Sequence, residues 1–178
     1  MSEPFFTIGH SRRTLTEFVE LLRGSRVESV VDVRRFPGSA RYPHFDQDTL
    51  STALDRLEIR YRHVEGLTGR RPVSKDVPFE VNAWWKNRSF HNYADHALSD
   101  NFRGALAELR ERGLAHRTVV MCSEAVWWRC HRRIIADHLL AHGKDVRHIL
   151  GGNHIDAAQL SLGAVVDPHG VVTYPATG

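Results

Sequence analysis

The stretch TVVMCSEAVWWRCHRRIIADHLLAH, residues 118–142, decides the fold of this chain. It opens with a short apolar run that contains two β-branched valines, and this composition predicts a buried strand. Apolar residues then recur at helical spacing from Ile134 to Leu140, and Gly143 ends the predicted helix. Between strand and helix lie two thiols, a carboxylate, an imidazole and three guanidiniums, so the same stretch locates a reactive site.

The rest of the chain alternates strands with helices. We predict strands at residues 5–8, 30–33, 59–64, 118–121 and 145–149, with helices in the 14–24, 46–57, 90–98, 99–113 and 131–142 regions. Thr14 with Glu17, Asp46 and Ser99 are the predicted N-terminal caps. The alternation predicts a mostly parallel, Rossmann-like α/β sheet of about five strands flanked by helices, in one domain over residues 1–178.

Two segments fall outside that alternation. Residues 70–89 show no regular pattern, and their length predicts a lid or an insertion loop. Residues 150–178 form a predicted C-terminal extension, in which two short apolar runs between 164 and 174 flank a turn and indicate a β-hairpin.

Composition narrows the class of protein. The chain has 178 residues, of which 42% are hydrophobic and 25% charged, as in ordinary globular proteins. We expect no membrane partner and a cytoplasmic location, because no apolar run reaches the length of a membrane span and no signal-peptide pattern opens the chain. The net charge of +3 permits a phosphate-bearing small molecule or nucleic acid as partner. Oligomeric state and cofactor stay open.

Arginine greatly outnumbers lysine, and many arginines fall in or beside predicted loops. Planar bidentate binding of phosphate or carboxylate favours arginine over lysine. The alternative is an arginine-rich solvated surface without a binding role. The loop arginines are Arg34, Arg35, Arg41, Arg70, Arg71, Arg129, Arg132 and Arg133.

Polar residues follow the predicted strands where each strand ends. His10 with Ser11, Asp32 with Arg34, the segment 65–69, and Cys122 with Glu124 all hold such positions. In open α/β sheets, ligands bind outside the carboxyl ends of the strands. We therefore expect these segments to form one cleft.

Each candidate has a functional and a structural interpretation. Cys122 is the candidate nucleophile or metal ligand, or else a small buried residue that closes its strand. Glu124 and Asp32 are candidates for proton transfer, although Asp32 with Arg34 also fits a buried ion pair that braces loops. His131 is an acid/base partner or a loop hydrogen bond. Cys130 is a packing residue or a redox partner of Cys122.

The predicted anion-binding residues come from several loops. Arg34, Arg41 and Arg132 would bind the anion, and His10 and Ser11 would orient a phosphate or cap the next turn.

Two familiar site types fit poorly. The loop from Cys122 to Arg129 is one residue longer than the phosphatase signature and holds two tryptophans but no glycine, whereas loops that direct backbone N–H groups at an anion favour small residues. The seven residues between Cys122 and Cys130 match no standard zinc spacing, although Cys122, Glu124, Cys130 and His131 contain enough donor atoms. The spacing therefore assigns no residue firmly to a metal, and a metal site stays an alternative.

Several motifs together resemble a known family. Residues 8–11 (IGHS), 32–34 (DVR) with Pro37, Ser39 and Phe45, 122–124 (CSE) and 130–132 (CHR) are similar to the bacterial and archaeal family called domain of unknown function 488. The resemblance spans about residues 7–149 and implies a compact α/β domain without an established reaction. Leu67-Thr68-Gly69 departs from the family's usual Leu-Gly-Gly, so no role that needs a glycine at position 68 is expected.

The leading hypothesis is an enzyme, or a degenerate enzyme, acting on a phosphate-bearing ligand such as a nucleotide or a nucleic-acid end. The first alternative is a non-catalytic module that docks nucleic acid or a protein through the same cleft. The second is a metal-binding redox or hydrolytic protein.

Overall fold

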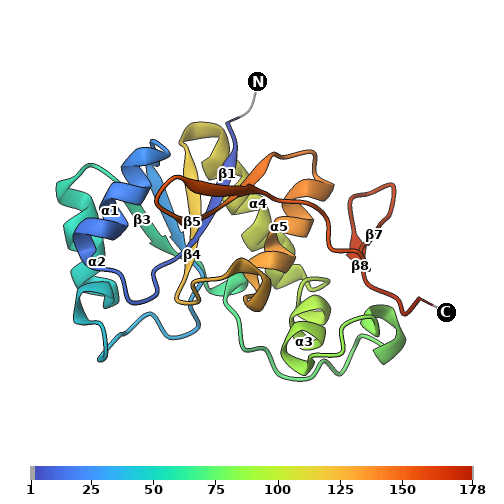
Figure 1. The fold of residues 1–178 in the computed structure, drawn as a ribbon. Helices are drawn as coiled ribbons and strands as arrows, with labels where there is room; N and C mark the ends of the chain where they lie inside the picture. The colour runs from blue at the N-terminus through green and yellow to red at the C-terminus, as the bar shows by residue number, and fades with distance from the viewer. Residues whose placement is uncertain (1–2, 178) are drawn as a thin grey trace.

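The computed structural model describes residues 3–177 and shows a layered α/β fold (Figure 1). Strand β4, predicted to be central, lies between β1 and β2 in the sheet order β3-β2-β4-β1-β5-β6. All neighbouring pairs are parallel except β5 with β6. The strands are β1 (Phe5–Gly9), β2 (Ser29–Asp32), β3 (Arg60–His63), β4 (Thr118–Cys122), β5 (Val146–Gly151) and β6 (His154–Ala157).

Within residues 3–177, five α-helices flank this sheet, and the sequence predicted each of them. They are α1 (Leu15–Gly24), α2 (Gln47–Arg56), α3 (Arg88–His96), α4 (Asp100–Ala115) and α5 (Arg132–Ala141). Thr14 and Glu17 form the expected capping box at α1, and the Ser99 side chain accepts a hydrogen bond from the Phe102 N–H at α4. Gly143 follows α5 with a φ of +77°, a left-handed conformation that glycine adopts at little cost. The described helices include none long and apolar enough to cross a membrane.

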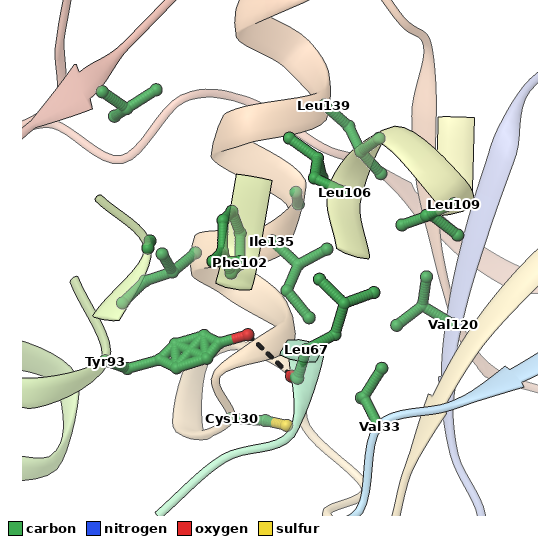
Figure 2. Packing of buried hydrophobic residues seen from close by; sticks show 14 of the residues in the cluster. Val33, Leu67, Tyr93, Phe102, Leu106, Leu109, Val120, Cys130, Ile135 and Leu139 are labelled. Atoms are coloured by element: carbon green, nitrogen blue, oxygen red, sulfur yellow. Dashed lines mark hydrogen bonds between the residues drawn. The ribbon is translucent and has the colours of Figure 1, made fainter. Parts of the chain in front are cut away.

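Both faces of the sheet are covered (Figure 1). Helices α1 and α2 pack Phe18, Leu22, Leu50 and Leu54 on one face. Helices α4 and α5 pack on the other, where Phe102, Leu106, Leu109, Ile135 and Leu139 form a continuous cluster (Figure 2). Strand β4 supplies Val119 and Met121 to the first cluster and Val120 and Cys122 to the second. Because successive side chains alternate between faces, Cys122 points toward the layer that holds α5.

The structure corrects two details of the sequence analysis. Gly151, Gly152 and Asn153 do not merely interrupt the chain, because they turn it back into the antiparallel edge strand β6. The main sheet thus has one strand more than predicted. The Asp46 side chain does not cap α2; its Oδ1 instead accepts a hydrogen bond from the Ser39 N–H at 3.1 Å.

The segment 70–89 is anchored in its second half. The side-chain amide of Asn82 donates from Nδ2 to Asp95 Oδ1 in α3 at 2.7 Å. The Oδ1 atom of the same amide accepts a hydrogen bond from the Tyr174 backbone N–H at 3.0 Å. Trp85 is buried beside them. A lid function for this segment stays a prediction. The predicted hairpin is present as β7 (Val165–Val166) and β8 (Val172–Thr173).

This topology brings separate parts of the chain to one edge. The carboxyl ends of β1, β4 and β2 are neighbours, with Gly9 opposite Cys122 and Asp32 opposite Met121. The residues that follow these strands therefore meet.

Candidate functional site

A cleft of about 700 Å³ opens at this carboxyl edge. The loops after β1, β2 and β4 line it, together with Gly69, Arg70 and the beginning of α3. The predicted site residues among its lining are His10, Ser11, Arg34, Cys122, Glu124 and His131. The cleft that the strand ends predicted is present in the structure.

Two thiols and an imidazole form the base of the cleft. One ligand atom from each of Cys122, Cys130 and His131 lies within 4.8 Å of the other two. The Cys130 Sγ lies 3.6 Å from Nδ1 of His131. Both cysteines are buried, at 8% and 5% exposed, and Figure 2 shows Cys130 at the margin of the apolar cluster near Leu67. Because both thiols border the cleft, they are sheltered from solvent but reachable from one side.

The surroundings of the two thiols shift their pKa values in opposite directions. The hydrogen bond with Cys130, together with burial, raises the pKa of Cys122 well above its usual value. Burial opposes ionisation of Cys130 as well, but the hydrogen bond with Cys122 and the positive charge of Arg132 outweigh it and lower the pKa of Cys130 to about 7. Cys130 is therefore the more acidic thiol. Sequence reasoning gave the leading role to Cys122, because only its position at a strand end was visible.

His131 has a defined orientation. Its Nε2 lies 3.0 Å from the Val33 carbonyl oxygen, which can only accept, so Nε2 carries the proton. Nδ1 then presents its lone pair toward Cys130. Burial lowers the pKa of His131, which favours the neutral ring. Tyr93 packs edge-on against that ring at 4.9 Å between centroids.

Asp32 is held inside the protein by an ion pair and hydrogen bonds, and its part in proton transfer stays a prediction. It is fully buried and does not line the cleft. Its carboxylate accepts hydrogen bonds from the Arg34 guanidinium, with Nη2 to Oδ2 at 2.8 Å, from the Arg34 backbone N–H and from the Tyr61 hydroxyl. This geometry matches the buried ion pair that the sequence left open. Burial and the Asp32 charge raise the pKa of Tyr61, so its hydroxyl stays a donor.

Arg34 reaches the cleft wall but is already engaged. Besides Asp32, it donates from Nη1 to the Phe45 carbonyl at 2.7 Å. His10 stacks on Phe45 at 4.3 Å between centroids. Burial lowers the pKa of His10 to about 4, so its ring is neutral at pH 7. Its Nδ1 lies 2.9 Å from the Ser11 carbonyl oxygen, to which it donates, and Nε2 accepts from Arg34 at 3.4 Å.

Of the remaining predicted residues, Glu124 and Ser11 line the cleft, whereas Arg132 and Arg41 do not. Glu124 is exposed in the cleft. Arg132 is buried behind the cleft, at 1% exposed, and donates from Nη1 to the Glu124 carbonyl at 2.9 Å. It thus braces the loop after β4. Arg41 lies outside the cleft, where its guanidinium packs over the Tyr42 ring at 5.5 Å. Ser11 lines the cleft in a left-handed turn with a φ of +51°.

Other arginines supply the charge of the cleft. Arg12, Arg35, Arg70 and Arg129 line it and are exposed. Within residues 3–177, no carboxylate forms an ion pair with Arg12, Arg70 or Arg129, and Arg35 lies 3.7 Å from Glu65. Sequence reasoning noted three of these arginines as loop residues but did not assign them to the site. Their closeness in sequence to the strand ends and to Cys130 was the available signal.

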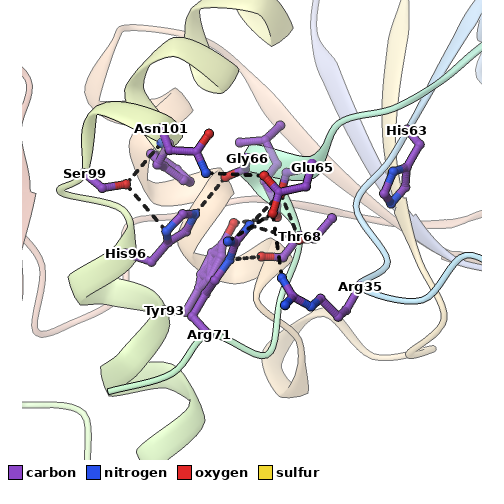
Figure 3. Close-up of polar contacts among 12 residues, drawn as sticks. Arg35, His63, Glu65, Gly66, Thr68, Arg71, Tyr93, His96, Ser99 and Asn101 are labelled. Carbon is purple, nitrogen blue, oxygen red and sulfur yellow. Dashed lines mark hydrogen bonds and ion pairs between the residues drawn. The ribbon is translucent and has the colours of Figure 1, made fainter. Parts of the chain in front are cut away.

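The segment that carries Gly69 is held rigidly (Figure 3). Arg71 donates to the Thr68 carbonyl at 3.0 Å and pairs with Glu65 at 3.3 Å. The Tyr93 hydroxyl donates to the Leu67 carbonyl at 2.7 Å, and His96 Nε2 donates to the Gly66 carbonyl at 2.8 Å. Helix α3 therefore fixes this loop against the base of the cleft. Thr68 has a φ of −69°, so its position does not require glycine.

The fold and the cleft define an α/β protein with a thiol–imidazole cluster at the carboxyl edge of a mostly parallel sheet. The sequence profile described as "Domain of unknown function DUF488" matches residues 14–139, and the chain belongs to this family. No curated protein and no solved structure shows significant similarity to the chain.

Proposed function

We propose that the protein is an enzyme that binds a phosphate-bearing ligand, a nucleotide or a nucleic-acid end, in this cleft. The observation that carries the proposal is the charge of its lining. Four exposed arginines (Arg12, Arg35, Arg70 and Arg129) line the same cleft as the thiol–imidazole cluster, and Glu124 is the one carboxylate among the described lining residues. Such an excess of exposed guanidinium groups in a concave site favours a multiply charged anion.

The remaining lining favours a nucleotide over a bare anion. Ser11, Ser39 and Ser89 add hydroxyl groups that can donate to phosphate oxygens. Phe36 is 68% exposed at the rim, and the Arg70 guanidinium lies 5.7 Å from its ring centroid. An exposed ring beside a guanidinium offers a stacking surface for a base.

Each site residue then has a role. Arg12, Arg35, Arg70 and Arg129 bind the phosphate, and the Asp32–Arg34 pair holds the cleft wall in place. Cys130 and Cys122 form the reacting centre, as nucleophile or as ligands. Glu124, exposed beside them, exchanges protons with the substrate or with water.

Calorimetric titration at low salt tests the proposal. We expect a nucleoside monophosphate to bind at least tenfold more tightly than its nucleoside. Arg129→Gln should remove most of that difference, whereas Arg23→Gln in α1, outside the cleft lining, should leave it unchanged. Equal affinity for nucleoside and nucleotide would contradict the proposal.

A non-catalytic module is the second candidate, because exposed Trp128 and Phe36 near the arginines also suit single-stranded nucleic acid. Oligonucleotide binding that is strongly salt-dependent and unchanged by Cys130→Ser, with no turnover of any phosphoester offered, would favour it.

A further inference from the structure

Cys122, Cys130 and His131 are arranged like the ligands of one metal ion. Metal–ligand distances of about 2.3 Å for sulfur and about 2.1 Å for nitrogen place sulfur and nitrogen roughly 3.6 Å apart around a tetrahedral ion. The Cys130 Sγ and His131 Nδ1 lie 3.6 Å apart, and all three ligand atoms fall within 4.8 Å of one another. A single ion can therefore contact all three after small side-chain rotations.

The orientation of His131 is an independent indication. Its Nε2–H donates to the Val33 carbonyl at 3.0 Å, which leaves the Nδ1 lone pair facing the Cys130 sulfur at 3.6 Å. Metal-binding histidines commonly donate their second ring N–H to a backbone carbonyl or carboxylate, because that bond fixes the tautomer and the ring direction. The free nitrogen of His131 is thus directed at the Cys130 sulfur, as a metal ligand at this position requires.

The two sulfur atoms and one imidazole nitrogen favour zinc as the bound ion. Thiolate and imidazole suit zinc, whereas magnesium and calcium require oxygen ligands. Three protein ligands with an open fourth position are typical of catalytic zinc, and structural zinc usually has four. All three candidate ligands line the cleft, so the open position faces the space where a ligand would bind.

We propose that Cys122, Cys130 and His131 bind a zinc ion whose fourth coordination position opens into the cleft and takes water or a phosphate oxygen. Arg132 supports an anionic fourth ligand. Two thiolates neutralise the charge of zinc. The Arg132 backbone N–H lies 3.5 Å from the Cys130 Sγ, and its buried guanidinium, which donates to the carbonyl of Glu124 at 2.9 Å, adds a positive charge near the centre. The zinc site stands without the proposed function, but phosphate as its fourth ligand rests on that function.

Metal analysis of the full-length chain tests the site. After zinc addition and dialysis under reducing conditions, we expect close to one zinc per chain. Cys130→Ser, Cys122→Ser and His131→Gln should each weaken zinc binding at least tenfold. His116→Gln, directly after the C-terminal end of α4 and outside the cleft lining, should not. Folded wild-type protein that retains less than a tenth of an equivalent would overturn the proposal, as would zinc binding that the three variants leave unchanged.

Cobalt substitution covers the case in which a variant fails to fold, because it uses only the wild-type chain. Thiolate-to-cobalt charge-transfer absorption with intense visible bands is expected for a four-coordinate centre, and its absence would contradict the site. Inorganic phosphate should change the visible bands. If phosphate leaves the bands unchanged while the protein still binds zinc, the proposal that phosphate is the fourth ligand is wrong. The zinc site itself would not be contradicted by that result. The nucleotide titration above tests the rim arginines separately.

Discussion

Gly69 lies directly against the imidazole of His131: a Cβ built on Gly69 would come within 2.8 Å of Nδ1 and 3.0 Å of Cε1. The His131 ring cannot easily move away from residue 69, because its Nε2 is hydrogen-bonded to the Val33 carbonyl and Tyr93 packs against the ring. The loop cannot easily retreat either, since Arg71 and α3 hold it. The absence of a side chain at residue 69 is thus a condition for the geometry of the thiol–imidazole cluster.

The first prediction concerns that contact. Gly69→Ala should lower the free energy of unfolding by about 1–3 kcal/mol through overpacking and should weaken zinc binding at least tenfold. Urea denaturation and metal titration measure the two effects. Gly104→Ala in α4 is the matched control, because a Cβ there meets nothing within 4 Å, and it should be neutral or stabilising by up to about 1 kcal/mol. Equal behaviour of the two variants would refute the steric argument.

The second prediction separates bracing from proton transfer at Asp32. Asp32→Asn leaves the buried Arg34 guanidinium without its counter-charge and should destabilise the protein by about 3–5 kcal/mol. Asp48→Asn, on the exposed side of α2, should change stability by no more than about 0.5 kcal/mol. If Asp32→Asn kept wild-type stability and lost only activity, the carboxylate would be a catalytic group after all.

The third prediction concerns the hydroxyl of Tyr93, which donates to the Leu67 carbonyl inside the core (Figure 2). Tyr93→Phe leaves that carbonyl unsatisfied and should cost about 1–3 kcal/mol of stability. Hydrogen exchange should show faster opening of residues 65–69, because the variant removes one of the bonds that hold this loop. Unchanged protection of residues 65–69 from hydrogen exchange would contradict this role of Tyr93 and would show that Arg71 and His96 alone hold the loop.

The fourth prediction concerns pH. Burial, with smaller effects from His142 and Arg103, lowers the pKa of His138 to about 3, below the unfolded value of about 6.5. The unfolded chain therefore binds the extra proton first, and His138 alone lowers stability by about 1.4 kcal/mol for each pH unit as pH drops from about 6.5 toward 3. His138→Leu should reduce that slope, and His169→Gln, at an exposed position, should not. Denaturation curves at several pH values decide between these outcomes.

Much of the fold was predictable because it depends on local patterns. The apolar runs of β1, β2 and β4 and the helical repeats of α1 to α5 identified a parallel α/β sheet, and the strand-end rule located the cleft. Strand β6 was missed because its sequence is polar and mostly exposed, so no apolar run marks it. Only the turn at Gly151–Asn153 could have indicated it.

The details of the site depend on contacts between distant segments, which periodicity does not reveal. The tautomer of His131 is set by Val33, and the space around its ring by Gly69. Arg41 and Arg129 look alike in sequence, yet only Arg129 lines the cleft. The bond of Asp32 to Arg34 was among the stated alternatives, but choosing it required the burial of both side chains.

Soaking crystals of the protein with a nucleoside monophosphate at low salt tests the central claim most directly. We predict density for the phosphate in the cleft beside Arg129 and Arg70, above Cys130 and Cys122. A nucleotide bound only elsewhere on the surface, with the cleft empty at saturating concentration, would contradict the assignment of this cleft as a phosphate-binding site.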